Sequence, residues 1–281
     1  LRITGAEDGI RVESGSTGFT LQRSVVYDND STGVWIFDAA STGAIIEDSV
    51  FYGNTTNDAS DQVYGVRSAA GSLQLLRNTA YHTGGRDSYG LYVVAAATGV
   101  VLRDNEVFNN SVAGIYVEAQ GFDVTGNIAH DNTSGIQLRD TNAATVSTSS
   151  GNTAYANDQE GFRYQSFGEH SGNAAHDNAT GFRSVTGFLG VLRDSSAWRN
   201  GIGIDFDGGD LHGNAAYGNT AAGIAIRRTG IFAGNRAYSN GVGIQFTATG
   251  GTSTVRNNLI YDNQIAGLEL VGAQSGIGAG A

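Results

Sequence analysis

The sequence predicts an all-β fold, a right-handed parallel β-helix (a β-solenoid) of about 11 coils with about 23 residues each. Two features of the 281 residues predict it. A glycine followed by an apolar residue recurs at intervals of 20 to 32 residues, and Asn recurs at two fixed places before most of these glycines. A β-solenoid tolerates uneven spacing because insertions leave at the turns while the strands stay stacked.

Each repeat contains one strand that begins at this glycine. The residue after the glycine is apolar in every repeat: Ile10, Val34, Val66, Leu91, Ile115, Ile136, Phe162, Phe182, Ile204, Ile224, Ile244 and Leu268. The residue two positions further on is also apolar, except at Ser68 and Ser184. A period of two indicates a strand with one buried face, and coils stacked about 4.8 Å apart would form apolar columns inside the solenoid.

Two polar columns, five residues apart, precede this strand. The first column is Ser24, Ser49, Asn78, Asn105, Asn127, Asn152, Asn173, Ser195, Asn214, Asn235 and Asn258. The second column is Asn29, Asn54, Thr83, Asn110, Asn132, Asn157, Asn178, Asn200, Asn219, Asn240 and Asn263. Asn adopts the left-handed backbone conformation readily, which suits tight turns, and stacked Asn side chains pair as a ladder.

An aromatic ring stands between the two Asn positions in every repeat: Tyr27, Tyr52, Tyr81, Phe108, His130, Tyr155, His176, Trp198, Tyr217, Tyr238 and Tyr261. Stacked rings would stabilise the solenoid beyond their buried area. The alternative is a stripe that stacks on sugars. Because His130 and His176 belong to this column, we interpret them as stacking residues rather than catalytic ones.

One inward-facing column contains two polar residues in adjacent coils, Ser149 and His170, among nine apolar ones. A buried imidazole without a hydrogen bond would cost about 1–3 kcal/mol. We therefore expect a Ser149–His170 hydrogen bond inside the core, with a neutral His170 that has no catalytic role.

The composition excludes several classes of function. The chain has no Cys, so it forms neither disulfides nor thiolate metal sites. A net charge of −11 argues against nucleic acid as a partner, and no apolar run is long enough for a membrane span. We expect one β-helix domain over residues 1–281, with a segment of a longer solenoid as the alternative.

The pattern N-x-A-[YH]-x-N-x-x-x-G-[IF], as in "AHDNTSGIQL" (129–138) and "AYGNTAAGIAI" (216–226), resembles the repeat of the pectate-lyase-like superfamily, and especially coils of the mannuronan epimerases. This resemblance implies a carbohydrate ligand on the outer face of the strand that opens each coil. The Y-G-F-D-P-H run of the epimerases is missing, since no Asp-Pro-His follows Tyr64-Gly65 or Tyr89-Gly90. The Lys base used by many lyases is also missing, which leaves Arg.

The outward positions of that strand include aromatic and basic residues suited to an acidic polysaccharide. Rings stack on sugar faces, and guanidinium groups pair with carboxylates. The predicted substrate-binding residues are Trp35, Arg67, Tyr92, Tyr116, Arg163 and Arg183. The alternative is an ordinary solvated sheet face.

The best catalytic candidates lie in "GIGIDFDGGDLHGN" (201–214), namely Asp205, Asp207, Asp210 and His212. Paired carboxylates can hydrolyse glycosidic bonds, and clustered carboxylates can bind Ca²⁺. No cofactor is otherwise expected.

Two functions remain open. The first is an extracellular or cell-surface structural or adhesive solenoid that binds glycans, with self-association through its ends. The second is a carbohydrate-active enzyme, either a polysaccharide lyase, an epimerase or a glycoside hydrolase.

Overall fold

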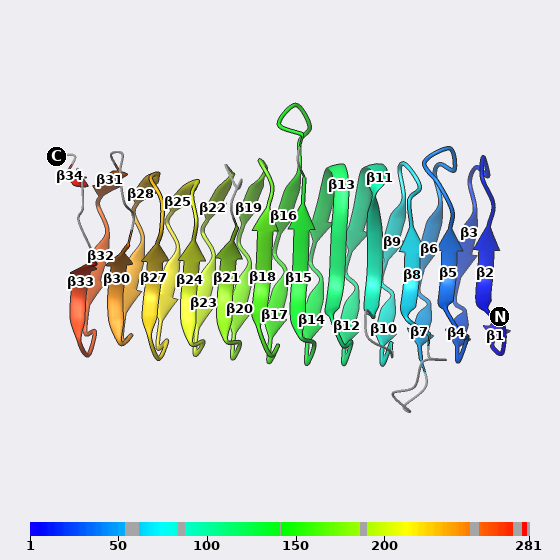
Figure 1. The fold of residues 1–281 in the computed structure, drawn as a ribbon, viewed down its shortest axis with the longest axis horizontal. Coiled ribbons are helices and arrows are strands. Elements are labelled where there is room, and N and C mark those ends of the chain that lie inside the picture. The colour runs from blue at the N-terminus through cyan, green and yellow to red at the C-terminus, as the bar shows by residue number, and fades with distance from the viewer. Residues whose placement is uncertain are drawn as a thin grey trace.

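The computed structural model describes residues 1–53, 62–83, 88–140, 142–185, 190–247, 253–271 and 277–279. Within these ranges the regular elements are β-strands, and the coils follow one another along a single axis from the N-terminus to the C-terminus (Figure 1). No helix in the described part of the chain is long and apolar enough to cross a membrane. The predicted all-β solenoid of about 11 coils is confirmed.

The strands form three parallel sets, and every strand pairs with its counterpart in the next coil. The first set is β2 (Asp8–Val12), β5 (Thr32–Ile36), β8 (Tyr64–Ser68), β11 (Tyr89–Arg103), β13 (Ala113–Thr125), β15 (Ser134–Arg139), β18 (Glu160–Gln165), β21 (Thr180–Ser184), β24 (Ile202–Phe206), β27 (Ala222–Ile226), β30 (Val242–Phe246) and β33 (Ala266–Leu270).

The second set contains β3 (Thr20–Gln22), β6 (Ile45–Glu47), β9 (Gln74–Leu76), β16 (Thr148–Ser150), β19 (Glu169–Ser171), β22 (Val191–Arg193), β25 (Asp210–His212), β28 (Ile231–Ala233), β31 (Ser253–Arg256) and β34 (Ile277–Ala279). In this set, two coils are represented by the C-terminal parts of the long strands β11 and β13, which pair with β9 and β16.

The third set is a 12-stranded sheet. It contains β1 (Arg2–Ile3), β4 (Val25–Tyr27), β7 (Val50–Tyr52), β10 (Thr79–Tyr81), β12 (Glu106–Phe108), β14 (Ile128–His130), β17 (Thr153–Tyr155), β20 (Ala174–His176), β23 (Ser196–Trp198), β26 (Ala215–Tyr217), β29 (Arg236–Tyr238) and β32 (Leu259–Tyr261).

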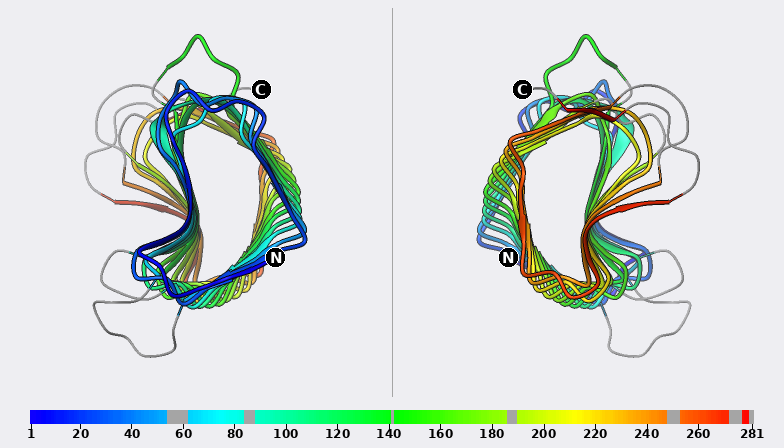
Figure 2. Two further views of the ribbon diagram at one scale, coloured as in Figure 1. Left: turned by 90° about the vertical axis from the view of Figure 1, so that its right-hand side faces the viewer. Right: turned by 90° about the vertical axis from the view of Figure 1, so that its left-hand side faces the viewer.

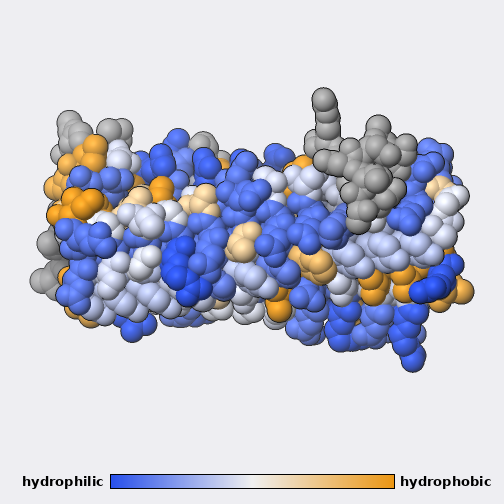
Figure 3. Space-filling model, turned by 90° about the horizontal axis from the view of Figure 1, so that it is seen from below, coloured by the Kyte–Doolittle hydropathy of each residue, from blue (hydrophilic) through white to orange (hydrophobic). Residues whose placement is uncertain are grey.

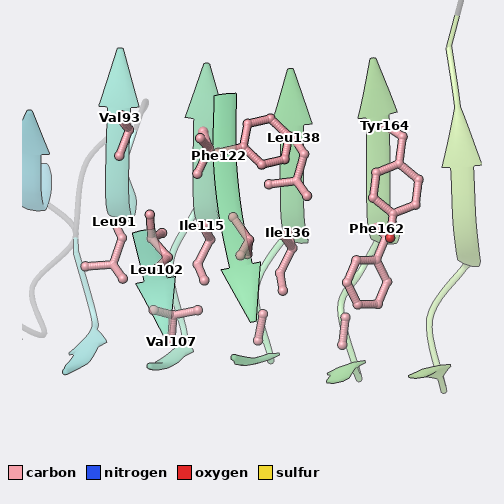
Figure 4. Close-up of a cluster of buried hydrophobic side chains, with 14 of the residues drawn as sticks. Leu91, Val93, Leu102, Val107, Ile115, Phe122, Ile136, Leu138, Phe162 and Tyr164 are labelled. Atoms are coloured by element: carbon pink, nitrogen blue, oxygen red, sulfur yellow. The ribbon is translucent and has the colours of Figure 1, made fainter. Parts of the chain in front are cut away.

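The core consists of the predicted apolar columns. Leu91, Ile115, Ile136 and Phe162 follow one another in successive coils, and each is fully buried (Figure 4). The alternation of buried and outward residues along the first strand set is therefore confirmed.

Six of the eleven large exposed apolar residues in the described ranges lie between Leu259 and Val271. Leu268 and Leu270 are 46 % and 51 % exposed, whereas Ile244 and Phe246 at the same positions one coil earlier are 1 % exposed. From below, the surface is largely hydrophilic, and apolar side chains show at this C-terminal end, on the left of Figure 3.

The Asn residues form two buried ladders. In the first ladder, Oδ1 of Asn127 accepts the backbone N–H of Asn105 at 2.9 Å and its Nδ2 at 2.8 Å, while Nδ2 of Asn105 also donates to the carbonyl oxygen of Leu75. This arrangement repeats coil after coil and satisfies buried polar groups at the turns. Where Ser replaces Asn, as at Ser49 and Ser195, its hydroxyl accepts only the backbone N–H.

The left-handed backbone does not fall on the ladder residues. Positive φ angles occur instead at the residue before each described rung, such as Asp104 (54°) before Asn105 and Asp131 (53°) before Asn132, while Asn54 lies outside the described residues. The expectation that Asn serves the turn by its own left-handed conformation is therefore wrong. Asn occupies these positions because its amide can both accept and donate between coils.

The aromatic column is a continuous stack. Centroid distances between successive rings from Tyr27 to Tyr261 lie between 4.5 Å (His176–Trp198) and 5.9 Å (Trp198–Tyr217). The nine rings from Tyr52 to Tyr238 are stacked on both faces, so these rings offer edges rather than faces to a ligand. The stacking role of His130 and His176 is confirmed.

The predicted hydrogen bond between Ser149 and His170 is also confirmed. Ser149 Oγ lies 2.8 Å from Nδ1 of His170, and Ser166 Oγ lies 2.7 Å from its Nε2. The imidazole is fully buried and stacks on Tyr164 at 4.0 Å between centroids. Burial lowers the pKa of His170 to about 3, which keeps the ring neutral at pH 7.

We predict that Asn157→Ala destabilises the fold by about 3–6 kcal/mol, because it leaves several buried groups unpaired at about 1–3 kcal/mol each. Oδ1 of Asn157 accepts two bonds from Asn132, and its Nδ2 donates to Ala129 and Asn178. Asn157→Ser should cost less because the hydroxyl still accepts the backbone N–H. Urea unfolding would measure both, with Asn142→Ala in an exposed loop as the control. Equal loss in all three variants would contradict the ladder's role.

We predict that His170 contributes to acid unfolding. An unfolded His has a pKa of about 6.5, whereas burial lowers the folded pKa of His170 to about 3. As pH falls below 6.5 the unfolded chain gains a proton that the folded chain lacks, so stability decreases by up to about 1.4 kcal/mol per pH unit. His170→Leu should therefore lose stability less steeply between pH 6.5 and 4 in urea titrations. The exposed-histidine variant His212→Asn should keep the wild-type slope, and an unchanged slope in His170→Leu would contradict the prediction.

Candidate functional site

The candidate site is the outer face of the first strand set. Viewed along the solenoid axis, the backbone of the coils curves inward along this face (Figure 2), and we call the outer face of the first strand set the groove. Two hollows lie in it, one beside Tyr116 and one beside Asp205. Because the strands pair in register, outward side chains of successive coils lie about 4.8 Å apart along the groove.

Trp35 stands at the N-terminal end of the groove between two arginines. The guanidinium carbon of Arg11 lies 5.0 Å from the Trp35 ring centroid, and that of Arg67 lies 5.3 Å away. The two arginines come from the coils on either side of Trp35. Both ring faces are therefore occupied by cations, which leaves only the ring edge of Trp35 for other contacts.

The next aromatic residues stack on one another. Tyr64 and Tyr89 are parallel within 1° at 5.9 Å, and Tyr89 packs on Tyr92 at 4.8 Å. Tyr116 departs from this stack, because its ring is tilted by 46° to Tyr92 and by 68° to Tyr89. Its neighbour in the following coil is Gln137, which has no ring to cover it. Tyr116 thus ends the aromatic tract.

A hollow of about 240 Å³ begins where the stack ends. Its lining is Tyr116, Gln137, Leu138, Arg139, Arg163 and Gln165. Nε of Arg139 is buried and has no hydrogen-bond partner among the described residues. Nη1 of the same guanidinium pairs with Glu118 at 2.9 Å, and Glu118 in turn accepts a 3.3 Å bond from Tyr116 Oη. Burial, reinforced by the charge of Glu118, raises the pKa of Tyr116 above its ordinary value.

Arginine–carboxylate pairs line the groove beyond this hollow. Arg183 lies 3.0 Å from buried Glu160, and Arg163 lies 3.7 Å from the same oxygen. In the second hollow, of about 330 Å³, Arg227 binds both carboxylate oxygens of Asp205. Although the protein is acidic overall, its groove contains several arginine side chains, and most of these form ion pairs with neighbouring carboxylates.

Comparison with known proteins identifies the architecture. The family model described as the right-handed β-helix region matches residues 8–178. The chain belongs to this family. No curated protein sequence matches this β-helix.

Solved structures share its fold at low identity. The A-module of Azotobacter vinelandii mannuronan C-5 epimerase AlgE4 superposes with a TM-score of 0.73 at 15 % identity, covering 100 % of this chain and 90 % of that one. The A-module of AlgE6 from the same organism gives 0.68 at 16 % identity, with coverage of 98 % and 90 %. Pectate lyase Pel9A gives 0.59 at 15 % identity, with coverage of 85 % and 72 %. These likenesses show the fold alone.

The structure separates the four catalytic candidates of this β-helix. Asp205 and Asp207 line the second hollow, whereas Asp210 and His212 lie on β25 in the second strand set and are absent from its lining. Asp207 is paired with Arg228 at 2.8 Å. The structure therefore places the four candidates in two groups on different strand sets. No group of three or more His, Asp or Glu residues able to hold a metal ion occurs in the described ranges.

Sequence reasoning missed Glu118, Arg139, Glu160 and Gln165. Residues two positions apart on a strand point to the same face. Glu118, Arg139 and Gln165 each lie two residues after an outward residue of the same strand, so this alternation predicts them on the groove face. Glu160 precedes the repeat glycine and was not considered because the pattern was read only from the glycine onward.

We predict that Glu118→Gln lowers the pKa of Tyr116, while burial keeps it above the ordinary value. Loss of the carboxylate removes a nearby negative charge, and it also releases Arg139, whose positive charge favours the phenolate. The phenol of Tyr116 can be followed by titrating the ultraviolet absorbance of tyrosinate at alkaline pH. Subtracting the titration curve of Glu118→Gln/Tyr116→Phe from that of Glu118→Gln leaves the contribution of Tyr116. The same subtraction in the wild-type background supplies the reference, and an equal or higher midpoint in the variant would refute this coupling.

Proposed function

We propose that this chain binds a polysaccharide lengthwise in the groove of the first strand set, as an extracellular or cell-surface structural or adhesive solenoid. The observation that carries the proposal is the hollow beside Tyr116. A ring face uncovered by a following ring, together with arginine and glutamine side chains, is the combination that protein sites use for sugars, with the ring packing on C–H groups and the polar groups bonding hydroxyls or carboxylates.

The wider groove supports the same assignment. Arg67 has no carboxylate within ion-pair distance among the described residues, and the side chain of Arg139 is 40 % exposed and lines the hollow. Both guanidinium groups suit an acidic sugar. The named activities of the structural neighbours, mannuronan epimerisation and pectate cleavage, concern acidic polysaccharides and favour the same ligand class for this chain.

The ion pairs of Asp205 and Asp207 favour binding of the polysaccharide without cleavage. Both oxygens of Asp205 bind Arg227, and Asp207 binds Arg228, so neither resembles a free acid–base pair. A polysaccharide lyase, epimerase or hydrolase remains the alternative. It would be supported by new reducing ends or unsaturated products from a polysaccharide panel that disappear in Asp205→Asn.

We predict that Tyr116→Ala weakens binding of polygalacturonate or alginate about 5–30-fold, which corresponds to about 1–2 kcal/mol for a lost ring contact. Arg139→Gln should weaken binding to these acidic chains and leave neutral glycans unaffected. Isothermal titration or affinity electrophoresis would measure both effects.

Tyr261→Ala is the matched control, since Tyr261 is an exposed tyrosine on the third strand set, outside the groove. It should bind like the wild type. Equal affinity of Tyr116→Ala and wild type for every glycan that binds would remove the hollow as the binding site.

A further inference from the structure

Glu160 is a buried carboxylate on the outer face of the sheet. It is 3 % exposed, although it stands at the first residue of β18 in a row that points into the groove. Apart from Asp8, the residues at this position in the other described coils are uncharged: Thr32, Tyr64, Tyr89, Ala113, Ser134, Thr180, Ile202, Ala222, Val242 and Ala266. A charge here therefore needs a specific explanation, because burying a carboxylate is costly unless it is paired.

Its partners are two arginines and a hydroxyl. Oε1 accepts a bond from Nη1 of Arg183 at 3.0 Å and lies 3.7 Å from Nη1 of Arg163, while Oε2 accepts from Ser134 Oγ at 3.0 Å. Arg163 and Arg183 are register neighbours on β18 and β21. Their side chains are 44 % and 46 % exposed, so their outer N–H groups face the groove.

The triad of Glu160, Arg163 and Arg183 has two arginines for one carboxylate, unlike the other ion pairs in the groove. Arg139 pairs with Glu118, Arg227 with Asp205 and Arg228 with Asp207, one carboxylate for each arginine. Among the described residues, Arg163 and Arg183 have a single carboxylate within ion-pair distance, which leaves one net positive charge on this triad. One further anionic group is needed to complete the triad.

We propose that Glu160 sets the charge selectivity of the groove. By neutralising one of two adjacent arginines, it makes the centre of the groove a site for a single carboxylate or sulfate on a glycan and weakens binding of densely charged polyanions. This role rests on the proposed glycan-binding function and deepens it, since it assigns a specificity-determining residue that lies beneath the ligand.

Glu160→Gln tests the role because glutamine keeps the size and hydrogen-bonding oxygen of the side chain and removes only the charge. The two arginines are half exposed and stay solvated without it, so the variant should fold. At low ionic strength we expect it to bind polygalacturonate and dextran sulfate at least about tenfold more tightly, the effect of removing one like charge a few ångströms from the ligand. The gain should shrink as NaCl screens it.

Three probes separate the sources of the anion. Polygalacturonate carries carboxylates, dextran sulfate carries sulfates, and neutral dextran carries neither and should bind Glu160→Gln and wild type equally. Glu169→Gln is the charge-matched control, because it removes the same charge from an arginine-paired carboxylate on β19, outside the groove. It should leave all three affinities unchanged.

Unchanged or weaker polyanion binding by folded Glu160→Gln would overturn the proposal, as would an equal gain in Glu169→Gln, which would indicate a general charge effect. Failure of the wild type to bind any glycan would instead refute the proposed function. In that case a gain of polyanion binding in Glu160→Gln would still support the role of Glu160, and no gain would overturn it.

Discussion

The register between coils is the constraint on which the rest of the structure depends, and the two Asn ladders hold it. Each rung bonds the backbone N–H and the side-chain amide of one coil to a single oxygen of the next, as Asn105 and Asn127 do. A slip of one residue would break these bonds in a buried setting and would turn every apolar side chain outward. The ladders therefore fix both which residues reach the core and which reach the groove.

Because the register is fixed, side chains that meet in the groove come from residues 20 to 32 positions apart in the sequence. Arg163 is placed beside Arg183 and Asp205 beside Ala225 by the same pairing that stacks Phe162 on Phe182. Charge pairs in the groove are consequently formed between coils: Glu118 reaches Arg139 in the following coil, and Asp205 reaches Arg227. The candidate binding surface therefore takes its order from the stacked strands of the core rather than from a set of loops.

The repeated features were predictable from sequence because each occurs many times and averaging removes local irregularity. The apolar columns, the aromatic stack and the inward Ser149–His170 pair all follow from aligned spacing. The single features were not, because Glu160 and Arg139 have no repeat to identify them and their partners depend on side-chain conformation. The separation of Asp210 and His212 from Asp205 and Asp207 likewise required the turn at Gly208 and Gly209, whose positive φ angles of 111° and 87° carry the chain to β25.

On a regular solenoid, identical residues stacked in register satisfy one another and leave little for a ligand. The third strand set illustrates this, since the nine rings from Tyr52 to Tyr238 each have a ring stacked on both faces. Recognition chemistry becomes available where a column changes character. Tyr116 lines a hollow where Gln137 follows it in place of a ring, and the shared carboxylate of Glu160 arises because an acid interrupts a row that is otherwise uncharged apart from Asp8. Breaks in the repeat, rather than the repeat itself, are therefore the positions at which function is to be sought in this fold.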